Sequence, residues 1–94
     1  MESKISIITA TYNSIETLKY ALESVSSQSY NNVEHIIIDG GSTDGTVKWL
    51  EKNQDKFTKW ISENDKGIYD ALNKGIKIAS GDIIGFMHAD DFYA

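Results

Sequence analysis

Two adjacent acidic residues, Asp90 and Asp91, are the strongest candidates for chemistry in this sequence. They follow the apolar run 83–87, which has the composition of a buried strand, so we expect them at its carboxyl end. Adjacent carboxylates repel each other unless a cation or water screens their charges. Carboxylate oxygens suit Mg²⁺ and Mn²⁺, which share their coordination shell with substrate phosphates. The pair is therefore a candidate metal site that bridges to phosphate, and the alternative is a helix cap or a solvated turn.

A second candidate is segment 39–45, which is rich in Gly, Asp, Ser and Thr. Its glycines would let the backbone approach a nucleotide closely, with Asp39 accepting a hydrogen bond from a base or a ribose. The alternative is a plain turn between a strand and a helix. The segment is not a P-loop, because no Gly-Lys-Ser/Thr follows it, and the first turn lacks the G-x-G-x-x-G pattern of dinucleotide sites.

Two further segments have both a functional and a structural interpretation. Tyr12 either stacks on a base or is a buried aromatic residue of a loop. Asp65 and Lys66 precede a predicted helix. They are either an N-cap and surface residues, or Lys66 and the N-terminus of the helix contact an anionic group. The sequence contains no nucleophilic serine elbow and no credible histidine-based triad.

The elements that must position these residues alternate along the chain. Mainly apolar, β-branched runs predict strands over 5–10, 33–38 and 82–87, and the first of them has the composition of a strand buried on both faces. The alternating run 57–62 predicts a shorter edge strand with one face in water.

Three amphipathic helices are predicted between these strands. Asn13 with Glu16 resembles a capping box at the start of the first helix, and Thr43 or Asp44 is expected to cap the second. The third helix is expected to end at Gly81 in a left-handed conformation. Its inward stripe is predicted to consist of Ile68, Ala71, Leu72, Gly75, Ile76 and Ala79.

This alternation predicts an α/β fold with a Rossmann-like three-layer αβα arrangement and a mostly parallel sheet. Right-handed crossovers favour the strand order 3-2-1-4. Strands one and four are then neighbours at a topological switch point, where ligands usually bind. Loops 11–14, 39–44 and 88–91 would leave the same edge of the sheet, next to that point.

Composition narrows the functional class. With 94 residues and a formal net charge of −5, the chain is expected to be one small domain that binds no nucleic acid, since nucleic-acid sites favour basic patches. The lack of cysteine excludes disulfides, thiolate metal sites and a cysteine nucleophile. We expect neither a signal peptide nor a membrane span, which makes a cytoplasmic location the default. Because the sequence stops three residues after Asp91, we also expect a truncated domain.

Four segments, taken in order, resemble the family-two glycosyltransferases and cover nearly the whole chain. They are Ser6–Asn13, Ile38–Thr46, Glu63–Gly75 and Gly81–Asp91. The resemblance implies a GT-A fold, of which residues 1–94 would be the N-terminal, nucleotide-sugar-binding part. It also implies an inverting transfer of a sugar from a nucleotide-diphosphate sugar to an acceptor, either a sugar or a lipid-linked molecule.

The same resemblance implies roles for individual residues. Asp90 and Asp91 match the DXD motif of the family, which holds Mg²⁺ or Mn²⁺ together with the donor diphosphate and ribose. Positions that resemble the donor-binding residues of the family are Ala10, Thr11, Tyr12, Asp39, Asp65, Lys66 and Asp90. Two positions depart from the pattern: Gly40 stands where many members carry an acid that reads the base, and His88 stands where many carry the first acid of the DXD motif.

The family places its catalytic base and acceptor site beyond residue 94, so we expect the isolated chain to be inactive. Self-association through strand 82–87, exposed as a sheet edge, is a further hypothesis. For the full-length protein, a position at the inner face of the membrane is the alternative to a free cytoplasmic one. A non-catalytic nucleotide-binding module is the alternative function, whereas a flavodoxin-like signalling domain fits the elements but not the four segments.

Overall fold

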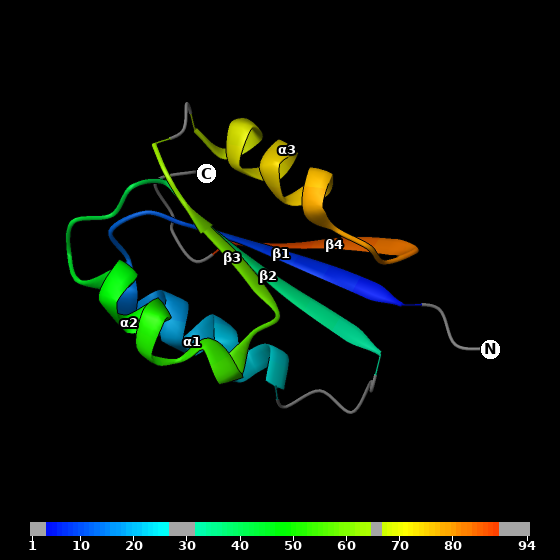
Figure 1. Ribbon diagram of the computed structural model, residues 1–94, viewed down its shortest axis with the longest axis horizontal. Coiled ribbons are helices and arrows are strands. Elements are labelled where there is room, and N and C mark those ends of the chain that lie inside the picture. Colours follow the sequence, from blue (N-terminus) through cyan, green and yellow to red (C-terminus); the bar gives the residue numbers. More distant parts are fainter. Residues whose placement is uncertain (1–3, 27–31, 65–66, 89–94) are drawn as a thin grey trace.

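A computed structural model describes residues 4–26, 32–64 and 67–88 of the chain. Four parallel strands form one sheet in the order β3-β2-β1-β4 (Figure 1). The strands are β1 (Ile5–Thr11), β2 (Val33–Asp39), β3 (Lys59–Ser62) and β4 (Ile83–His88). The helices are α1 (Ile15–Ser26), α2 (Thr46–Lys52) and α3 (Ile68–Ile78), with a 3₁₀ turn at Gln54–Lys56. The predicted α/β class and the strand order 3-2-1-4 are confirmed.

The helices form two outer layers around the sheet. Figure 1 shows α1 and α2 on one face and α3 on the other. The first two crossovers lead from β1 to β2 and from β2 to β3, toward one edge of the sheet. The third runs from β3 back past β2 and β1 to β4. Because each crossover is right-handed, this reversal of direction moves α3 to the opposite face.

Two apolar clusters fill the spaces between these layers. The cluster under α1 and α2 consists of Leu18, Ala21, Leu22, Ile37 and Leu50, with Trp49, Phe57 and Trp60 packed against it. The cluster under α3 consists of Ile8, Ala10, Ile36, Ile38 and Ala71, with Ile61, Leu72, Ile78 and Ala79 packed against it. Ile37 of β2 enters the first cluster while its neighbours Ile36 and Ile38 enter the second. This is why β2 has three consecutive isoleucines, Ile36–Ile38, in its second half.

The edge strand β3 differs from its prediction in two ways. It begins at Lys59 rather than at Phe57, which follows the 3₁₀ turn. All of its residues are half-buried, so the predicted wet face is wrong. Trp60 packs against the first cluster and Ile61 against the second, because helices cover both faces of the sheet near this edge.

Helix α3 packs closely on β1 because Gly75 has no side chain. A Cβ at Gly75 would lie 2.5 Å from Cγ2 of Ile8, which is fully buried. The predicted inward stripe is confirmed at Ala71 but wrong at Ile76, which is 47% exposed. The described residues therefore cover only about half of the Ile76 surface.

The predicted left-handed cap at Gly81 is also wrong. Helix α3 ends at Ile78, and the following residue, Ala79, is extended. The Gly81 N–H donates a 2.8 Å hydrogen bond to Ser6 Oγ, and a Cβ at Gly81 would lie 2.5 Å from that same oxygen. The position therefore requires glycine because two segments of the chain approach closely, not because of a positive φ.

Strand β4 forms the other edge of the sheet, and much of its apolar surface is exposed. Ile83, Ile84 and Phe86 are between 36% and 50% exposed. Because Phe86 is paired with Ile8, which lies in the cluster under α3, it faces the same side of the sheet as α3, yet about half of its surface is exposed. The expected exposed edge is confirmed within the described residues. Separately, none of the described helices is long and apolar enough to cross a membrane.

Candidate functional site

The carboxyl ends of all four strands meet at one edge of the sheet. Thr11 at the end of β1 is paired with Asp39 at the end of β2, and Asp39 is paired with Ser62 at the end of β3. On the other side of β1, Ala10 is paired with His88, the last residue of β4. The loops after β1 and β2, where we predicted a site, therefore begin side by side, and β4 ends next to them.

Asp39 is the centre of the hydrogen bonding at this edge. Its side chain is fully buried, and Oδ2 accepts hydrogen bonds from Ser62 Oγ at 2.8 Å and from the N–H groups of Ser42 at 2.9 Å and Gly41 at 3.2 Å. Its Oδ1 accepts a 2.5 Å hydrogen bond from Ser42 Oγ. The carboxylate therefore holds the loop after β2 in place and joins it to β3. Its direct contact with a nucleoside stays a prediction.

The segment after β1 presents one side chain to the surface. Ala10 and Thr11 are fully buried, whereas Tyr12 is 40% exposed. The Thr11 carbonyl accepts a 2.9 Å hydrogen bond from the Gly40 N–H, while Thr11 Oγ1 has no hydrogen-bond partner among the described residues. The interpretation of Tyr12 as a buried loop residue is wrong, and its stacking on a base stays a prediction.

Asn13 does not form the predicted capping box. Its backbone has a φ of +48°, a left-handed conformation that Asn tolerates better than most residues. Its Oδ1 accepts a 2.7 Å hydrogen bond from the Thr43 N–H, and its own N–H donates to Ser42 Oγ at 2.7 Å. Glu16 is paired with Lys19 instead. Asn13 thus contacts the loop after β2 rather than the first turn of α1.

Asp44 connects the first turns of two helices. Gly45, with a φ of +96°, is the N-cap residue of α2, so neither Thr43 nor Asp44 occupies the predicted position. Asp44 nevertheless accepts hydrogen bonds from the Thr46 N–H at 3.1 Å and from the Ile15 N–H at 3.2 Å. Burial alone would raise the pKa of Asp44, but the hydrogen bonds from Thr46 and Ile15 outweigh it and lower the pKa below its usual value.

The loop after β3 lies against the loop after β2. The Glu63 N–H donates to the Asp39 carbonyl at 3.0 Å. Gly41 has a φ of +89°, and a Cβ at this position would collide with Oδ1 of Asn64. Lys74 of α3 donates a 3.0 Å hydrogen bond to the Asn64 carbonyl and forms an ion pair with Glu63. Helix α3 thereby holds this third loop at the edge.

Four of the predicted site residues lie outside the described residues. These are Asp65, Lys66, Asp90 and Asp91. Strand β4 ends at His88, next to Ala10, and the two aspartates follow two and three positions later in the sequence. Within residues 4–26, 32–64 and 67–88, no group of three or more His, Cys, Asp or Glu side chains could hold a metal ion. Metal binding by Asp90 and Asp91 therefore stays a prediction.

Three residues that organise the edge were not predicted as site residues from the sequence: Ser42, Ser62 and Asn64. Asp side chains commonly accept from the backbone two residues on, as Asp39 does from Gly41, and Ser42 is the next residue, so this contact had a local signal. Ser62 and Asn64 reach Asp39 and Gly41 only through the pairing of β3 with β2. No local pattern indicates that contact.

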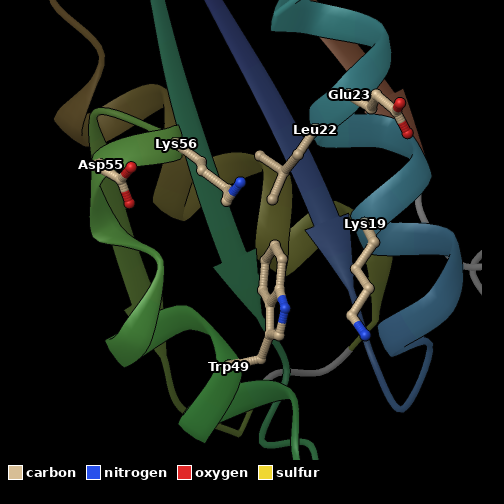
Figure 2. A pocket seen from close by; sticks show the side chains of 6 residues that line it. All are labelled: Lys19, Leu22, Glu23, Trp49, Asp55 and Lys56. Carbon is tan, nitrogen blue, oxygen red and sulfur yellow. The ribbon is translucent and has the colours of Figure 1, made fainter.

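A groove of about 560 Å³ lies elsewhere, between α1 and the segment that contains α2 and the 3₁₀ turn (Figure 2). It is lined by Lys19, Leu22, Glu23, Trp49, Asp55 and Lys56. The Lys19 ammonium lies 5.9 Å from the centre of the Trp49 ring. None of the predicted site residues lines the groove, so we assign the candidate site to the sheet edge.

Comparison with known proteins shows similarity to glycosyltransferases. The model of the family described as Glycosyl transferase family 2 matches residues 6–94. An uncharacterized glycosyltransferase of Mycobacterium tuberculosis is 43% identical over 91 residues, which are 96% of this chain and 35% of that protein. The Escherichia coli protein named UDP-Glc:alpha-D-GlcNAc-diphosphoundecaprenol beta-1,3-glucosyltransferase WfaP is 41% identical over 90 residues, which are 95% of this chain and 36% of that protein. The chain thus spans about a third of the length of these relatives.

The fold is also similar to solved structures. The mannosyltransferase PcManGT from Pyrobaculum calidifontis, in complex with GDP-Man and Mn²⁺, matches with a TM-score of 0.83 and 26% sequence identity. The match covers 96% of this chain and 28% of that chain.

Proposed function

Because the chain belongs to glycosyl transferase family 2, we propose that it carries the donor site of an enzyme that transfers a sugar from a nucleotide-diphosphate sugar. The observation that carries the proposal is the arrangement of the three loops around Asp39 at the carboxyl edge of the sheet. Open α/β sheets bind ligands at this edge, where strand order reverses. Here the order reverses between β1 and β4, next to Tyr12.

We assign the parts of the donor to the parts of this edge. The segment Ala10–Tyr12 and the loop that Asp39 organises would bind the nucleoside, with the exposed ring of Tyr12 as its aromatic contact. Asp65 and Lys66, which precede α3 in the sequence, would contact the anionic part of the donor.

The diphosphate would be bound through a divalent cation held by Asp90 and Asp91. Their oxygen atoms suit Mg²⁺ or Mn²⁺, and the bound cation would neutralise charge on the leaving diphosphate. The mannosyltransferase with a similar fold was solved with GDP-Man and Mn²⁺, which supports this assignment. In this chain, the cation would also offset the formal net charge of −5, which otherwise disfavours an anionic ligand.

The transfer itself is proposed to proceed with inversion at the sugar carbon. Such a transfer needs a carboxylate that removes the proton of the acceptor hydroxyl. Asp39 is a poor candidate because it is buried and accepts four hydrogen bonds. We propose that the base lies outside this chain, which alone would bind the donor without turnover. A continuous transfer of sugar by the purified 94-residue chain would contradict this.

The acceptor is proposed to be a sugar or a lipid-linked sugar. The name of the E. coli relative specifies a diphosphoundecaprenol acceptor, which supports the lipid-linked alternative. With such an acceptor, the full-length enzyme would work at the inner face of the membrane.

Calorimetric titration tests the donor site directly. The 94-residue chain is titrated with UDP and with GDP, each with and without Mn²⁺. We expect one of them to bind only with Mn²⁺, and binding to be lost in Asp91→Ala. Asp55→Ala is the matched control, because Asp55 lines the groove in Figure 2, away from the sheet edge, and should not affect binding. Equal, weak, metal-independent binding of both nucleotides would contradict the metal-bridged donor site.

A further inference from the structure

The two loops that begin at β1 and β2 are held together by reciprocal hydrogen bonds. From the first loop, Asn13 Oδ1 accepts from the Thr43 N–H at 2.7 Å. From the second loop, Asp44 Oδ2 accepts from the Ile15 N–H at 3.2 Å. A third hydrogen bond joins the Asn13 N–H to Ser42 Oγ at 2.7 Å. Each loop thus uses a side chain to satisfy a backbone group of the other.

These contacts extend to the centre of the candidate site. Ser42 Oγ, which accepts from Asn13, donates to Asp39, and Asp39 in turn accepts from Ser62 of β3. Asn13 is also the residue that follows the exposed Tyr12. A change at Asn13 therefore alters the position of Tyr12 relative to the loop that Asp39 organises.

We propose that Asn13 is a positioning residue for donor binding in the proposed reaction, on which this inference rests. It acts by fixing the loop after β1 against residues 42–44, so the nucleoside surface exists before the donor arrives. A surface that is already ordered loses less conformational entropy on binding. Without the contact, each binding event would have to order both loops, and affinity would fall.

Two substitutions at residue 13 separate the contribution of its left-handed backbone from that of its side-chain acceptor. Asn13→Gly retains the left-handed backbone without strain but removes the acceptor. Asn13→Asp retains an acceptor oxygen and tolerates the same backbone conformation. Asn53→Ala is the matched control, because it removes another 2.7 Å hydrogen bond between an Asn side chain and the backbone, at the end of α2 and away from the sheet edge.

The test measures nucleotide affinity and stability in the same four proteins. UDP and GDP are titrated in the presence of Mn²⁺, thermal unfolding is followed without nucleotide, and hydrogen exchange is measured at the Thr43 N–H. We expect Asn13→Gly to bind about 5- to 10-fold more weakly and to exchange this hydrogen faster, as expected for the loss of about one hydrogen bond. Asn13→Asp should remain within about 2-fold of wild type, and Asn53→Ala should lose stability but no affinity.

Three outcomes would overturn the proposal, and each has a different meaning. If wild type binds a nucleotide and Asn13→Gly binds it equally well, Asn13 is only a structural residue and the proposed function stands. If wild type binds neither nucleotide, the proposed function and the positioning role fail together. If both Asn13 variants and Asn53→Ala lose affinity in proportion to their stability, the effect is global unfolding, and the positioning role is rejected.

Discussion

The Ser42 hydroxyl donates a 2.5 Å hydrogen bond to the Asp39 carboxylate, which is fully buried at the end of β2. Through this hydrogen bond, Asp39, the last residue of β2, holds the loop that follows the strand. The same carboxylate accepts from Ser62, so one side chain determines how the loops after β2 and β3 lie relative to each other. The shape of the candidate donor site therefore depends on a residue whose side chain is not on the surface.

Replacing Asp39 by Asn should damage both stability and binding. An amide has one acceptor oxygen. If this oxygen takes the Oδ2 position, the NH₂ group replaces Oδ1 and faces the Ser42 hydroxyl, which loses its carboxylate acceptor. We expect the free energy of unfolding to fall by about 2–3 kcal/mol, because buried donors lose their partners. Urea denaturation measures this, and the exposed Asp55→Asn should change it by less than about 0.5 kcal/mol. Equal stability of Asp39→Asn and wild type would contradict the anchoring role.

An ion pair between the buried Glu34 of β2 and Lys59, the first residue of β3, should make the free energy of unfolding depend on pH in the acid range. Glu34 lies 2.8 Å from Lys59 Nζ and also accepts hydrogen bonds from Ser6 and Ser80. Burial alone would raise the pKa of Glu34, but the hydrogen bonds from Lys59, Ser80 and Ser6 outweigh it and lower the pKa to about 2. Since the folded pKa is below that of the unfolded chain, about 4.5, this stabilisation is present above pH 4.5 and lost as the pH falls toward 2.

The variant Glu34→Gln tests this prediction. It should be less stable than wild type at pH 7, and the difference should shrink as the pH falls from about 4.5 to about 2. Denaturant unfolding at a series of pH values measures the difference. Glu51→Gln is the matched control, because Glu51 is exposed. A difference between Glu34→Gln and wild type that does not change with pH would contradict the assignment.

His35 should cause a second loss of stability in acid, at a higher pH than the loss due to Glu34. Its ring is buried, with Nε2 2.7 Å from Thr9 Oγ1 and no hydrogen-bond partner for Nδ1 among the described residues. Burial lowers the pKa of His35 from 6.5 to about 4, because the charged ring loses its hydration. The unfolded chain therefore takes up a proton first, and stability should fall as the pH decreases from 6.5 toward 4.

Proton uptake at His35 is measurable by NMR titration and by unfolding at several pH values. We expect His35→Gln to abolish the loss of stability between pH 6.5 and 4. The sequence has two histidines, so His88→Gln serves as the matched control and should retain that loss. If His88→Gln removes the pH dependence and His35→Gln does not, the prediction is wrong.

Two glycines with different surroundings should respond differently to substitution by alanine. At Gly75, a Cβ would lie 2.5 Å from Ile8, whereas at Gly85 the nearest atom is 3.9 Å away, in Ile7. We expect Gly75→Ala to cost about 1–3 kcal/mol through overpacking, even after the gain in helix propensity. Gly85→Ala should fold with nearly unchanged stability. Thermal unfolding compares them, and an equally stable Gly75→Ala would show that α3 can move away from the sheet.

Strand β4 should mediate self-association of the 94-residue chain. Its exposed side chains include Ile84 and Phe86, and edge strands with apolar surface pair readily with other chains. We expect sedimentation velocity to show dimers or larger species at high concentration and Phe86→Lys to reduce them. Tyr20→Lys is the control, because Tyr20 is an exposed aromatic residue (74%) on helix α1 and not on the edge strand. A strictly monomeric wild type at the highest concentration would refute the hypothesis.

The sequence by itself determined the elements and their order in the sheet. Apolar β-branched runs separated by amphipathic helices, together with right-handed crossovers, leave few topologies, so the order 3-2-1-4 could be predicted. The same pattern placed Asp39 and Tyr12 at one edge, because parallel strands end on the same side. The errors concerned the ends of elements and the exposure of single side chains such as Ile76 and Tyr12. Gly81 was interpreted from helix-capping preferences alone, although its close contact with Ser6 comes from the other end of the chain.

Only the tertiary structure decided which side chains hold the site together. Asn13 has the sequence context of a helix cap, but the loop after β2 offers it the Thr43 N–H, and this partner lies 30 positions away. Ser62 likewise contacts Asp39 only because β3 pairs with β2. Hydrogen bonds of this kind depend on distances below about 3.2 Å between atoms of different segments. Local periodicity carries no information about such distances, so they emerge only when the whole sheet is assembled.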